Sequence, residues 1–251
     1  MFDFSGFREE CERLEAVIRF GEISFMRYRT NLLVHHYRVA LMIADIAEYI
    51  PDDYDLDLTI TFALIHDFVE NITGDVSLRE KLLMSEDEKR RHDEREIEAI
   101  DILVSRNQTH INGYCFRDLL MAVYKKKLPE THLGSYADKI DALCESLHEN
   151  FAGNPFVNPN EGRTPTLPYL KIIPDLLKTY PHLADFIPSD KHPLLAPIPN
   201  LDVERIIVNG QPHTEESIWM PTGIPQYDRW KELTATHLGV DYLIKQKEFL
   251  P

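Results

Sequence analysis

The chain has 251 residues, of which 43% are hydrophobic, and its 27 Lys and Arg against 42 Asp and Glu give a net charge of −15 at pH 7. This length and composition suit a soluble globular protein that can bury a sizeable core. A strongly acidic chain lacks the basic face that nucleic-acid polymers and anionic membranes require, so we expect neither as a partner.

Prolines divide the chain near residue 150. Only Pro51 and Pro129 of the sixteen prolines precede residue 155, so the first part can be helical almost without interruption. Apolar residues recur there at helical spacing and alternating runs are scarce, which predicts an all-α domain over 1–150. The predicted helices span residues 7–20, 34–49, 55–70, 85–106, 115–126 and 133–150.

Residues 151–251 are predicted to form a proline-rich extension that packs on this domain. Short apolar islands make it too apolar for a disordered segment. We expect largely irregular structure with a helix at 168–178 and a hairpin at Asn209-Gly210, because that pair is a turn signal. A final amphipathic helix is predicted near 226–248.

The cysteines and the N-terminus indicate a cytoplasmic protein. Cys11, Cys115 and Cys144 are too few and too scattered for a disulfide framework or a cysteine zinc site. The N-terminal segment carries charges where a signal peptide needs an apolar stretch, and no run approaches the roughly 18 apolar residues of a membrane span.

The stretch ALIHDFVENITGDVS, residues 63–77, places polar groups at the end of an apolar run. The preceding LDLTITFAL is apolar or small on nearly every face, so an ionised Asp67 is costly there unless it is paired or bound to a metal. A His-Asp pair alone is weak evidence, because an isolated histidine is more often a hydrogen-bonded core residue. Further ligands must therefore come from other helices.

Two other segments supply candidate ligands. His35-His36 begins the helix VHHYRVALMIADIA, and YADKIDALCESL carries Asp138 and Asp141. With the His-Asp pair they form a set of His, His-Asp and Asp from three helices. Such a set suits one divalent ion, with Mn²⁺, Co²⁺, Zn²⁺, Mg²⁺ and Fe²⁺ as candidates, and leaves positions for water and a phosphate oxygen. His35 is favoured over His36, and the Ala-Asp-Lys setting favours Asp138 over Asp141.

The order of these motifs resembles the HD-domain metal-dependent phosphohydrolases, and within them the bacterial 5′-deoxynucleotidases of the YfbR type. The most specific motif, H-D-x-x-E-x-x-T-G-D, fixes six positions with their spacing. The resemblance spans about residues 12–150 and rests on RF at 19–20, RT at 29–30, HHYRVA at 35–40, HDFVENITGD at 66–75 and ADKIDAL at 137–143.

The resemblance implies an HD-domain helical bundle and a role for each matching residue. It implies that the metal is held by His35, His66, Asp67 and Asp138. It also implies that Glu70 is the general acid or base, with Asp67 counted as catalytic too. Substrate contacts are implied for Arg19, Phe20, Thr73 and Asp75.

Some of these residues differ from the family pattern, and one of them has two possible roles. Arg19 matches a phosphate-binding arginine, and Phe20 stands where that branch has a tryptophan. The family's Glu-His pair reads Val34-His35 here. Asp75 fits both a pocket carboxylate that accepts a sugar hydroxyl and an N-cap of the next helix.

The chemistry of phosphate esters explains these residue types. A phosphomonoester dianion repels hydroxide, so a metal must bind a phosphate oxygen and lower the pKa of its water. Glu70 lies three residues after Asp67, and one continuous helix would project it over the same face, within reach of that water. Thr73-Gly74-Asp75 is then expected to end that helix.

We therefore predict an enzyme that removes the 5′-phosphate from deoxyribonucleoside monophosphates, a small-molecule substrate. One alternative is a dNTP triphosphohydrolase or a hydrolase of another small phosphate ester, although triphosphate binding would need more basic residues than the sequence places at the site. Another is a catalytically silent HD module whose tail occludes the cleft. Relatives of this type dimerise, so a homodimer is a further expectation.

Overall fold

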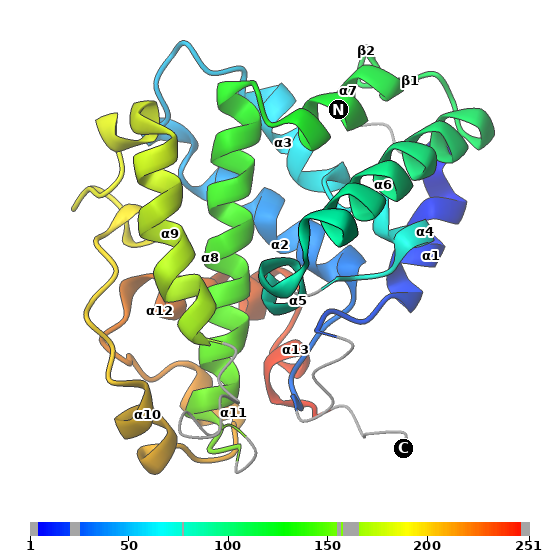
Figure 1. Cartoon of the computed structure of the whole chain (residues 1–251). Helices are drawn as coiled ribbons and strands as arrows, with labels where there is room; N and C mark the ends of the chain where they lie inside the picture. The colour runs from blue at the N-terminus through cyan, green and yellow to red at the C-terminus, as the bar shows by residue number, and fades with distance from the viewer. Residues whose placement is uncertain (1–4, 21–25, 77, 155–156, 158–165, 247–251) are drawn as a thin grey trace.

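The structure is a computed structural model, and it describes residues 5–20, 26–76, 78–154, 157 and 166–246. The described residues form an all-α protein with a two-stranded antiparallel ribbon, as predicted (Figure 1). No helix within them is long and apolar enough to cross a membrane. The elements up to residue 151 are η1 Ser5–Phe7, α1 Arg8–Ala16, α2 Leu32–Asp45, η2 Ala47–Tyr49, α3 Leu56–Ile65, α4 Glu70–Thr73, α5 Leu78–Leu83, α6 Glu86–Arg106, β1 His110–Ile111, β2 Tyr114–Cys115, α7 Phe116–Lys125 and α8 Pro129–Phe151.

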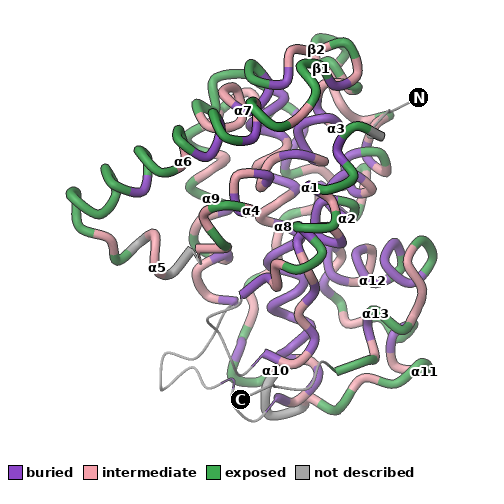
Figure 2. Tube along the Cα trace, turned by 90° about the vertical axis from the view of Figure 1, so that its right-hand side faces the viewer, coloured by how far each residue is buried: buried purple, intermediate pink, exposed green. Residues whose placement is uncertain are grey.

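Helix α8 is the axis of the molecule. It is 23 residues long and buried along most of its length (Figure 2). Pro129 occupies its first turn, where a missing backbone N–H costs nothing. Helices α2, α3 and α9 pack against it, so residues far apart in the sequence meet on its surface.

Helices α2 and α3 begin at side-chain caps that the sequence supplies. Asn31 accepts a hydrogen bond from the Val34 N–H at 2.9 Å, and Asp55 accepts one from the Leu58 N–H at 2.9 Å. Each cap satisfies a backbone donor that has no partner within its helix. These caps fix where the two helices enter the core beside α8.

The predicted helix over 55–70 is wrong in its second half. Helix α3 ends at Ile65, and a tight turn separates it from α4. His66 Nδ1 donates to Ala63 O at 2.8 Å, which is the acceptor that the Asp67 N–H would use if the helix continued. Glu70 therefore begins a new helix instead of sharing one with Asp67.

Helix α6 has the solvated character that its charges predict. Ser85 and Glu88 form a capping box, with Ser85 N–H donating to Glu88 Oε2 at 2.8 Å. Most of its side chains are exposed, and Figure 2 shows the exposed helix along one side of the molecule. Its few buried residues face the core that it shares with α7.

The extension is more helical than we predicted. Prolines 181, 193 and 225 each stand at the first turn of a helix, a position that tolerates proline. The predicted helix at 168–178 is confirmed as α9. The elements after residue 151 are α9 Thr166–Thr179, η4 Pro181–Asp185, η5 Pro193–Leu195, α10 Val203–Asn209, α11 Glu215–Ile218, α12 Pro225–His237 and α13 Asp241–Ile244.

Two local predictions in the extension are wrong. The segment around Asn209-Gly210 is not a hairpin, because Asp202 accepts the Arg205 N–H at 3.1 Å and starts α10 there. Gly210 follows that helix and lies so close to Gly153 that a Cβ would come within 2.4 Å of the Gly153 nitrogen. The final helix is also divided, because Gly239 with φ +102° separates α12 from α13.

Two stacked histidines link α8 to the C-terminal region. The ring centroids of His148 and His213 lie 3.7 Å apart, and His213 Nε2 donates to His148 O at 2.7 Å. His148 Nδ1 accepts from the Tyr227 hydroxyl and Nε2 donates to Leu243 O, both at 2.7 Å. Burial lowers the pKa of His148 well below its usual value and the pKa of His213 to about 4. Both rings are therefore neutral in the folded protein.

These histidines should make the fold sensitive to acid. As pH falls below about 6.5, the unfolded chain takes up protons before the folded protein does, so the free energy of unfolding decreases. His213 alone should account for about 1 to 2 kcal/mol of this loss by about pH 5. Urea titrations at about pH 7.5 and about pH 5 check this in the wild type and in His213→Gln. The variant should lose less stability between these values, and an equal loss in both proteins contradicts the assignment.

Candidate metal centre

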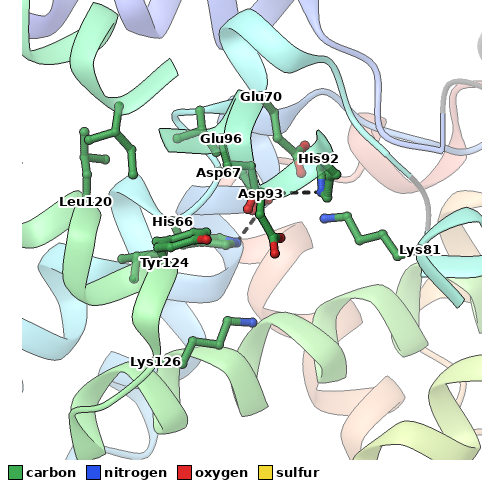
Figure 3. A pocket seen from close by; sticks show the side chains of 13 residues that line it. His66, Asp67, Glu70, Lys81, His92, Asp93, Glu96, Leu120, Tyr124 and Lys126 are labelled. Atoms are coloured by element: carbon green, nitrogen blue, oxygen red, sulfur yellow. Dashed lines mark ion pairs between the residues drawn. The ribbon is translucent and has the colours of Figure 1, made fainter. Parts of the chain in front are cut away.

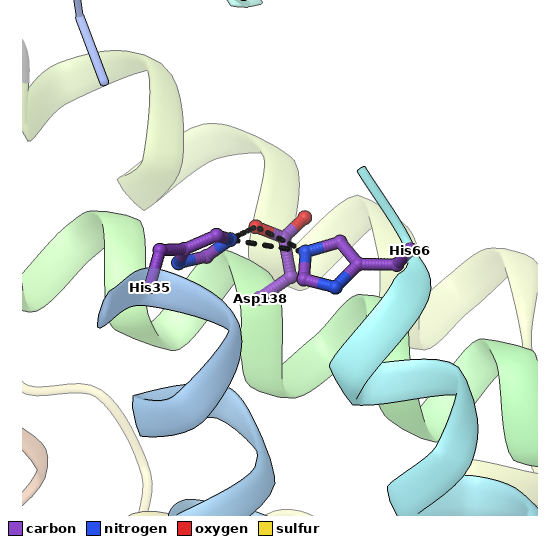
Figure 4. Close-up of side chains that lie close together, drawn as sticks. All are labelled: His35, His66 and Asp138. Carbon is purple, nitrogen blue, oxygen red and sulfur yellow. Dashed lines mark hydrogen bonds and ion pairs between the residues drawn. The ribbon is translucent and has the colours of Figure 1, made fainter. Parts of the chain in front are cut away.

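Four predicted ligands from three parts of the chain meet at one point. His35 comes from α2, His66 from the end of α3 and Asp138 from α8 (Figure 4). His35 Nε2 lies 3.0 Å from His66 Nε2, 3.3 Å from Asp138 Oδ1 and 3.5 Å from Asp67 Oδ2. His66 Nε2 lies 3.2 Å from Asp67 Oδ2 and 4.0 Å from Asp138 Oδ1. The structure thus brings the whole predicted ligand set together.

Hydrogen bonds on the far side of each ring fix the histidine tautomers. His35 Nδ1 faces Asp141 Oδ2 at 2.7 Å, and His66 Nδ1 faces Ala63 O at 2.8 Å. A carboxylate and a carbonyl oxygen only accept, so each Nδ1 must carry a proton. In the neutral rings both Nε2 atoms therefore present lone pairs to one another and to two carboxylates. A cation between them, either a proton or a metal ion, removes this repulsion.

The spacing of these atoms suits a divalent ion. An octahedral ion with bonds of about 2.1 Å sets neighbouring ligand atoms about 3.0 Å apart and opposite ones about 4.2 Å apart. The distances from the His35 and His66 nitrogens to one another and to the oxygens of Asp67 and Asp138 fall between 3.0 and 4.0 Å. The ligand atoms of His35, His66 and Asp138 all lie within 4.8 Å of one another. The donor set of two imidazoles and two carboxylates therefore fits such an ion.

The electrostatics of His35 show how strongly this point attracts a cation. Burial and the charge of Arg19 lower the pKa of His35, but hydrogen bonds to Asp138, Asp141 and Asp67 outweigh both effects and raise it to about 9. The carboxylates that stabilise a proton on His35 would stabilise a metal ion in the same way. A proton and a metal are thus competitors for the same site.

Asp141 belongs to an outer layer around the ligands. It is fully buried, and its oxygens accept hydrogen bonds from Arg38 Nε at 2.8 Å and Trp230 Nε1 at 2.7 Å in addition to His35. A carboxylate that holds the remote nitrogen of a metal-binding histidine orients the ring and raises its basicity. The sequence departs from the family at Val34, and Asp141 supplies the buried carboxylate instead.

His36 offers a second way to complete a ligand set. It is 1% exposed, and neither of its ring nitrogens has a hydrogen-bond partner within the described part of the chain. Its Nε2 lies 3.9 Å from Asp67 Oδ2, and ligand atoms of His36, His66 and Asp67 also cluster within 4.8 Å. His35 is closer to both carboxylates, so we favour it as the ligand.

Glu70 lies beside this cluster with its carboxyl group unpaired. Its side chain is buried, and Oε2 has no hydrogen-bond partner among the described residues. Burial and the charges of Asp67 and Asp75 raise the pKa of Glu70 well above its usual value. A buried carboxyl with a raised pKa beside a ligand cluster is typical of a general acid or base.

A small cavity brings most of the other predicted substrate residues to the cluster. It measures about 80 Å³ and is lined by Arg19, Phe20 and Asp75 together with Asp67, Glu70, Val76, Lys81, Asp138, Lys139 and Tyr169. Asp75 Oδ2 accepts the Phe20 N–H at 2.7 Å and so fixes the strained backbone of Phe20, whose φ is +53°. Arg19 Nη1 is buried without a hydrogen bond to any described residue.

Thr73 lies apart from these residues. Its hydroxyl donates to Val69 O at 3.2 Å, and Thr73 lines neither of the two cavities beside the cluster. Gly74 follows with φ +78°, a conformation that favours glycine and ends α4. A role for Thr73 in substrate binding stays a prediction.

A larger cavity of about 510 Å³ has His66, Asp67 and Glu70 in its wall (Figure 3). Lys81 from α5 and Lys126 from the end of α7 extend toward it. Neither lysine stands out in the sequence, because no local pattern separates them from ordinary surface lysines. Its other lining residues are Val69, His92, Asp93, Glu96, Ile100, Leu120, Val123 and Tyr124.

Comparison with known proteins identifies the family. A family model described as an HD domain matches residues 11–156, which is more than half of the chain. The chain belongs to the HD-domain family. The match includes all four predicted ligands and Glu70, and it ends near the proposed start of the extension at residue 151.

Solved structures with a similar chain path have low sequence identity. A conserved hypothetical protein from Pyrococcus furiosus is 21% identical, with a TM-score of 0.48 over 67% of this chain and 96% of that chain. A predicted metal-dependent phosphohydrolase from Magnetospirillum magnetotacticum is 19% identical, with a TM-score of 0.48 over 77% of this chain and 94% of that one. No curated protein matches the chain significantly.

Substitution of single histidines should show whether His35 or His36 completes the metal-binding set. His35→Ala and His66→Ala should each weaken metal binding by roughly 100-fold or more, beyond the effect typical of an outer-layer partner. His36→Ala should retain the metal. Metal content after dialysis against Mn²⁺ or Co²⁺, measured by elemental analysis, checks this, with circular dichroism to establish folding. Loss of metal from His36→Ala together with retention in His35→Ala would show that the other ligand set is the true one.

Proposed function

We propose that this chain is a metal-dependent phosphohydrolase that removes the 5′-phosphate from deoxyribonucleoside monophosphates. The observation that carries the proposal is the convergence of the four candidate ligands beside the buried carboxyl of Glu70, whose Oε2 has no hydrogen-bond partner among the described residues. The H-D-x-x-E-x-x-T-G-D motif and the HD-domain family match support it.

The donor set defines what a metal would contribute. A divalent ion held by His35, His66, Asp67 and Asp138 would lower the pKa of a water molecule and neutralise charge on a phosphate oxygen. The side chains of His66, Asp67 and Asp138 are 14%, 24% and 14% exposed, so part of the coordination sphere faces the cavities. His35 is fully buried and closes the opposite side.

Glu70 is the residue that we assign to proton transfer. Burial and the charges of Asp67 and Asp75 raise its pKa, which favours the protonated carboxyl and so suits donation to the oxygen of the leaving group. The carboxylate that results can accept a proton from the attacking water. Glu70 lines both cavities, so it can reach a bond placed at their junction.

Arg19 is the residue that we assign to the phosphate. Its guanidinium lies 3.6 Å from Glu145 and Asp141 and 3.9 Å from Asp138. Burial lowers the pKa of Arg19, but these three carboxylates outweigh that effect and raise it, so the charge is permanent. Because Nη1 has no hydrogen bond to a described residue, it can donate to a phosphate oxygen.

A dNTP triphosphohydrolase is the second candidate. Lys81, Lys126 and Lys139 lie around the ligand cluster, which gives the site more positive charge than the sequence alone suggested. Product analysis distinguishes the two reactions, because a monoesterase cannot release triphosphate from a dNTP.

Phosphate release from a nucleotide panel tests the proposed substrate. The protein is stripped with a chelator, reloaded with Mn²⁺, Co²⁺, Mg²⁺, Zn²⁺ or Fe²⁺, and assayed with deoxyribonucleoside and ribonucleoside monophosphates and with dNTPs. We expect turnover of dNMPs only after metal is added. Turnover of dNTPs with no turnover of monophosphates would contradict the proposed substrate.

Substitution of Glu70 tests its role in proton transfer. Glu70→Gln should retain the metal and lose about 10²- to 10⁴-fold in kcat, which is the usual effect of a positioned acid or base. Glu98→Gln, on the exposed face of α6, is the matched control and should keep full activity. Normal turnover by Glu70→Gln would show that another group transfers the proton.

A further inference from the structure

Two cavities of very different size meet at the ligand cluster. They share Asp67, Glu70 and Lys81, and the rest of their walls comes from different residues. The smaller measures about 80 Å³, and the larger, between α6 and α7, measures about 510 Å³. We call the larger one the α6–α7 cavity.

The two cavities differ so much in volume that each suits a different part of a substrate. At about 80 Å³ against about 510 Å³, the smaller cavity suits a phosphate group better than a sugar and a base. Binding sites for small organic molecules usually measure about 300 to 1,000 Å³, and the α6–α7 cavity falls in that range.

The side chains that line the smaller cavity also suit a phosphate group. Arg19 and Lys139 bring positive charge to it, and Asp75 already holds the Phe20 N–H. Phe20 is 5% exposed, and its ring packs edge-on against Tyr169 with centroids 6.3 Å apart. These contacts support the phosphate end and leave little aromatic surface for a base.

The side chains that line the α6–α7 cavity suit a neutral ring. Ile100, Leu120 and Val123 supply apolar surface, and Tyr124 supplies an aromatic side chain. Figure 3 shows Tyr124 and the polar side chains of α6 among the residues that line the cavity.

The wall also carries charges of both signs. Asp93 and Glu96 come from α6, and Lys81 and Lys126 face the same cavity, which Asp67 and Glu70 line as well (Figure 3). Two carboxylates would repel additional phosphate groups, whereas carboxylates and ammonium groups together can bind a neutral group that has both hydrogen-bond donors and acceptors.

We propose that the α6–α7 cavity binds the organic leaving group of the substrate, a neutral ring-bearing alcohol such as a nucleoside, and that Val123 and Tyr124 determine its specificity. This inference rests on the proposed phosphohydrolase function. It assigns the nucleoside to the α6–α7 cavity and not to the smaller cavity, which Phe20 and Asp75 line.

This placement puts the reacting bond beside Glu70. Water adds to phosphorus, and the bond between phosphorus and the leaving oxygen breaks. The Glu70 proton passes to that oxygen, and a proton from the attacking water restores the Glu70 carboxyl. The products are the free alcohol and inorganic phosphate. One group at the junction of the two cavities can serve both transfers.

A bulky side chain in the cavity tests the proposal. Val123→Trp fills the α6–α7 cavity, and Lys125→Trp places the same side chain on the exposed face of α7 as the matched control. We expect Val123→Trp to raise the KM for dNMPs by about 10-fold or more, because the indole excludes the nucleoside, while the inhibition constant of inorganic phosphate is unchanged. Lys125→Trp should resemble the wild type in both.

An unchanged KM in a folded, metal-loaded Val123→Trp protein overturns the proposal. If Val123→Trp does not fold, Tyr124→Ala removes the aromatic contact without adding volume and should also raise the KM. An unchanged KM in that variant overturns the proposal equally.

A binding measurement separates this inference from the proposed catalytic function. Equilibrium dialysis of the four deoxynucleosides against the metal-loaded protein, with inorganic phosphate present, needs no turnover. Binding to the wild type and to Lys125→Trp but not to Val123→Trp supports the cavity assignment. Equal binding to both variants, or none to the wild type, overturns it. Absence of phosphatase activity from the wild type would instead overturn the proposed function.

Discussion

Mutual repulsion among ligand atoms is the constraint on which the site depends. Two imidazole nitrogens 3.0 Å apart face two carboxylates, and hydrogen bonds to Asp141 and Ala63 keep the protons on the far side of both rings. In a partly buried site these charges cannot remain together without a cation. The fold therefore has to hold a strained arrangement in place, and the surrounding helices supply the support.

Helix α8 provides much of that support through one row of acids. Asp138, Asp141, Glu145 and Glu149 follow one another at spacings of three or four residues, where an amphipathic helix would place apolar side chains. Each has a partner from another segment: Asp141 binds Arg38, Glu145 accepts the Thr30 N–H at 2.8 Å, and Glu149 accepts the Tyr28 N–H at 2.5 Å. The row thus holds the segment that carries Arg19 against α8.

Local pattern predicted most of the helices, because helical periodicity is a property of neighbouring residues. Motif spacing singled out four ligand candidates, which the structure brings close together. Local pattern failed where one side chain changed the backbone, as at His66, whose bond to Ala63 O ends α3. It also failed at Asn209-Gly210, where Asp202 started a helix. Asp141 was weighed as a ligand and not as an outer-layer carboxylate, since its role depends on residues up to 106 positions away. The roles of the site residues and the boundary near residue 150 stay predictions.

The contact between Trp230 and Asp141 connects the extension to the ligand cluster. The indole N–H donates to Asp141 at 2.7 Å, and the Arg38 guanidinium lies 4.9 Å from the ring centroid. Trp219, the other tryptophan of the chain, is 54% exposed. Intrinsic fluorescence can therefore be divided by solvent quenchers into a shielded signal from Trp230 and an accessible one from Trp219. The shielded emission offers an internal optical probe of events at the centre, with no added label.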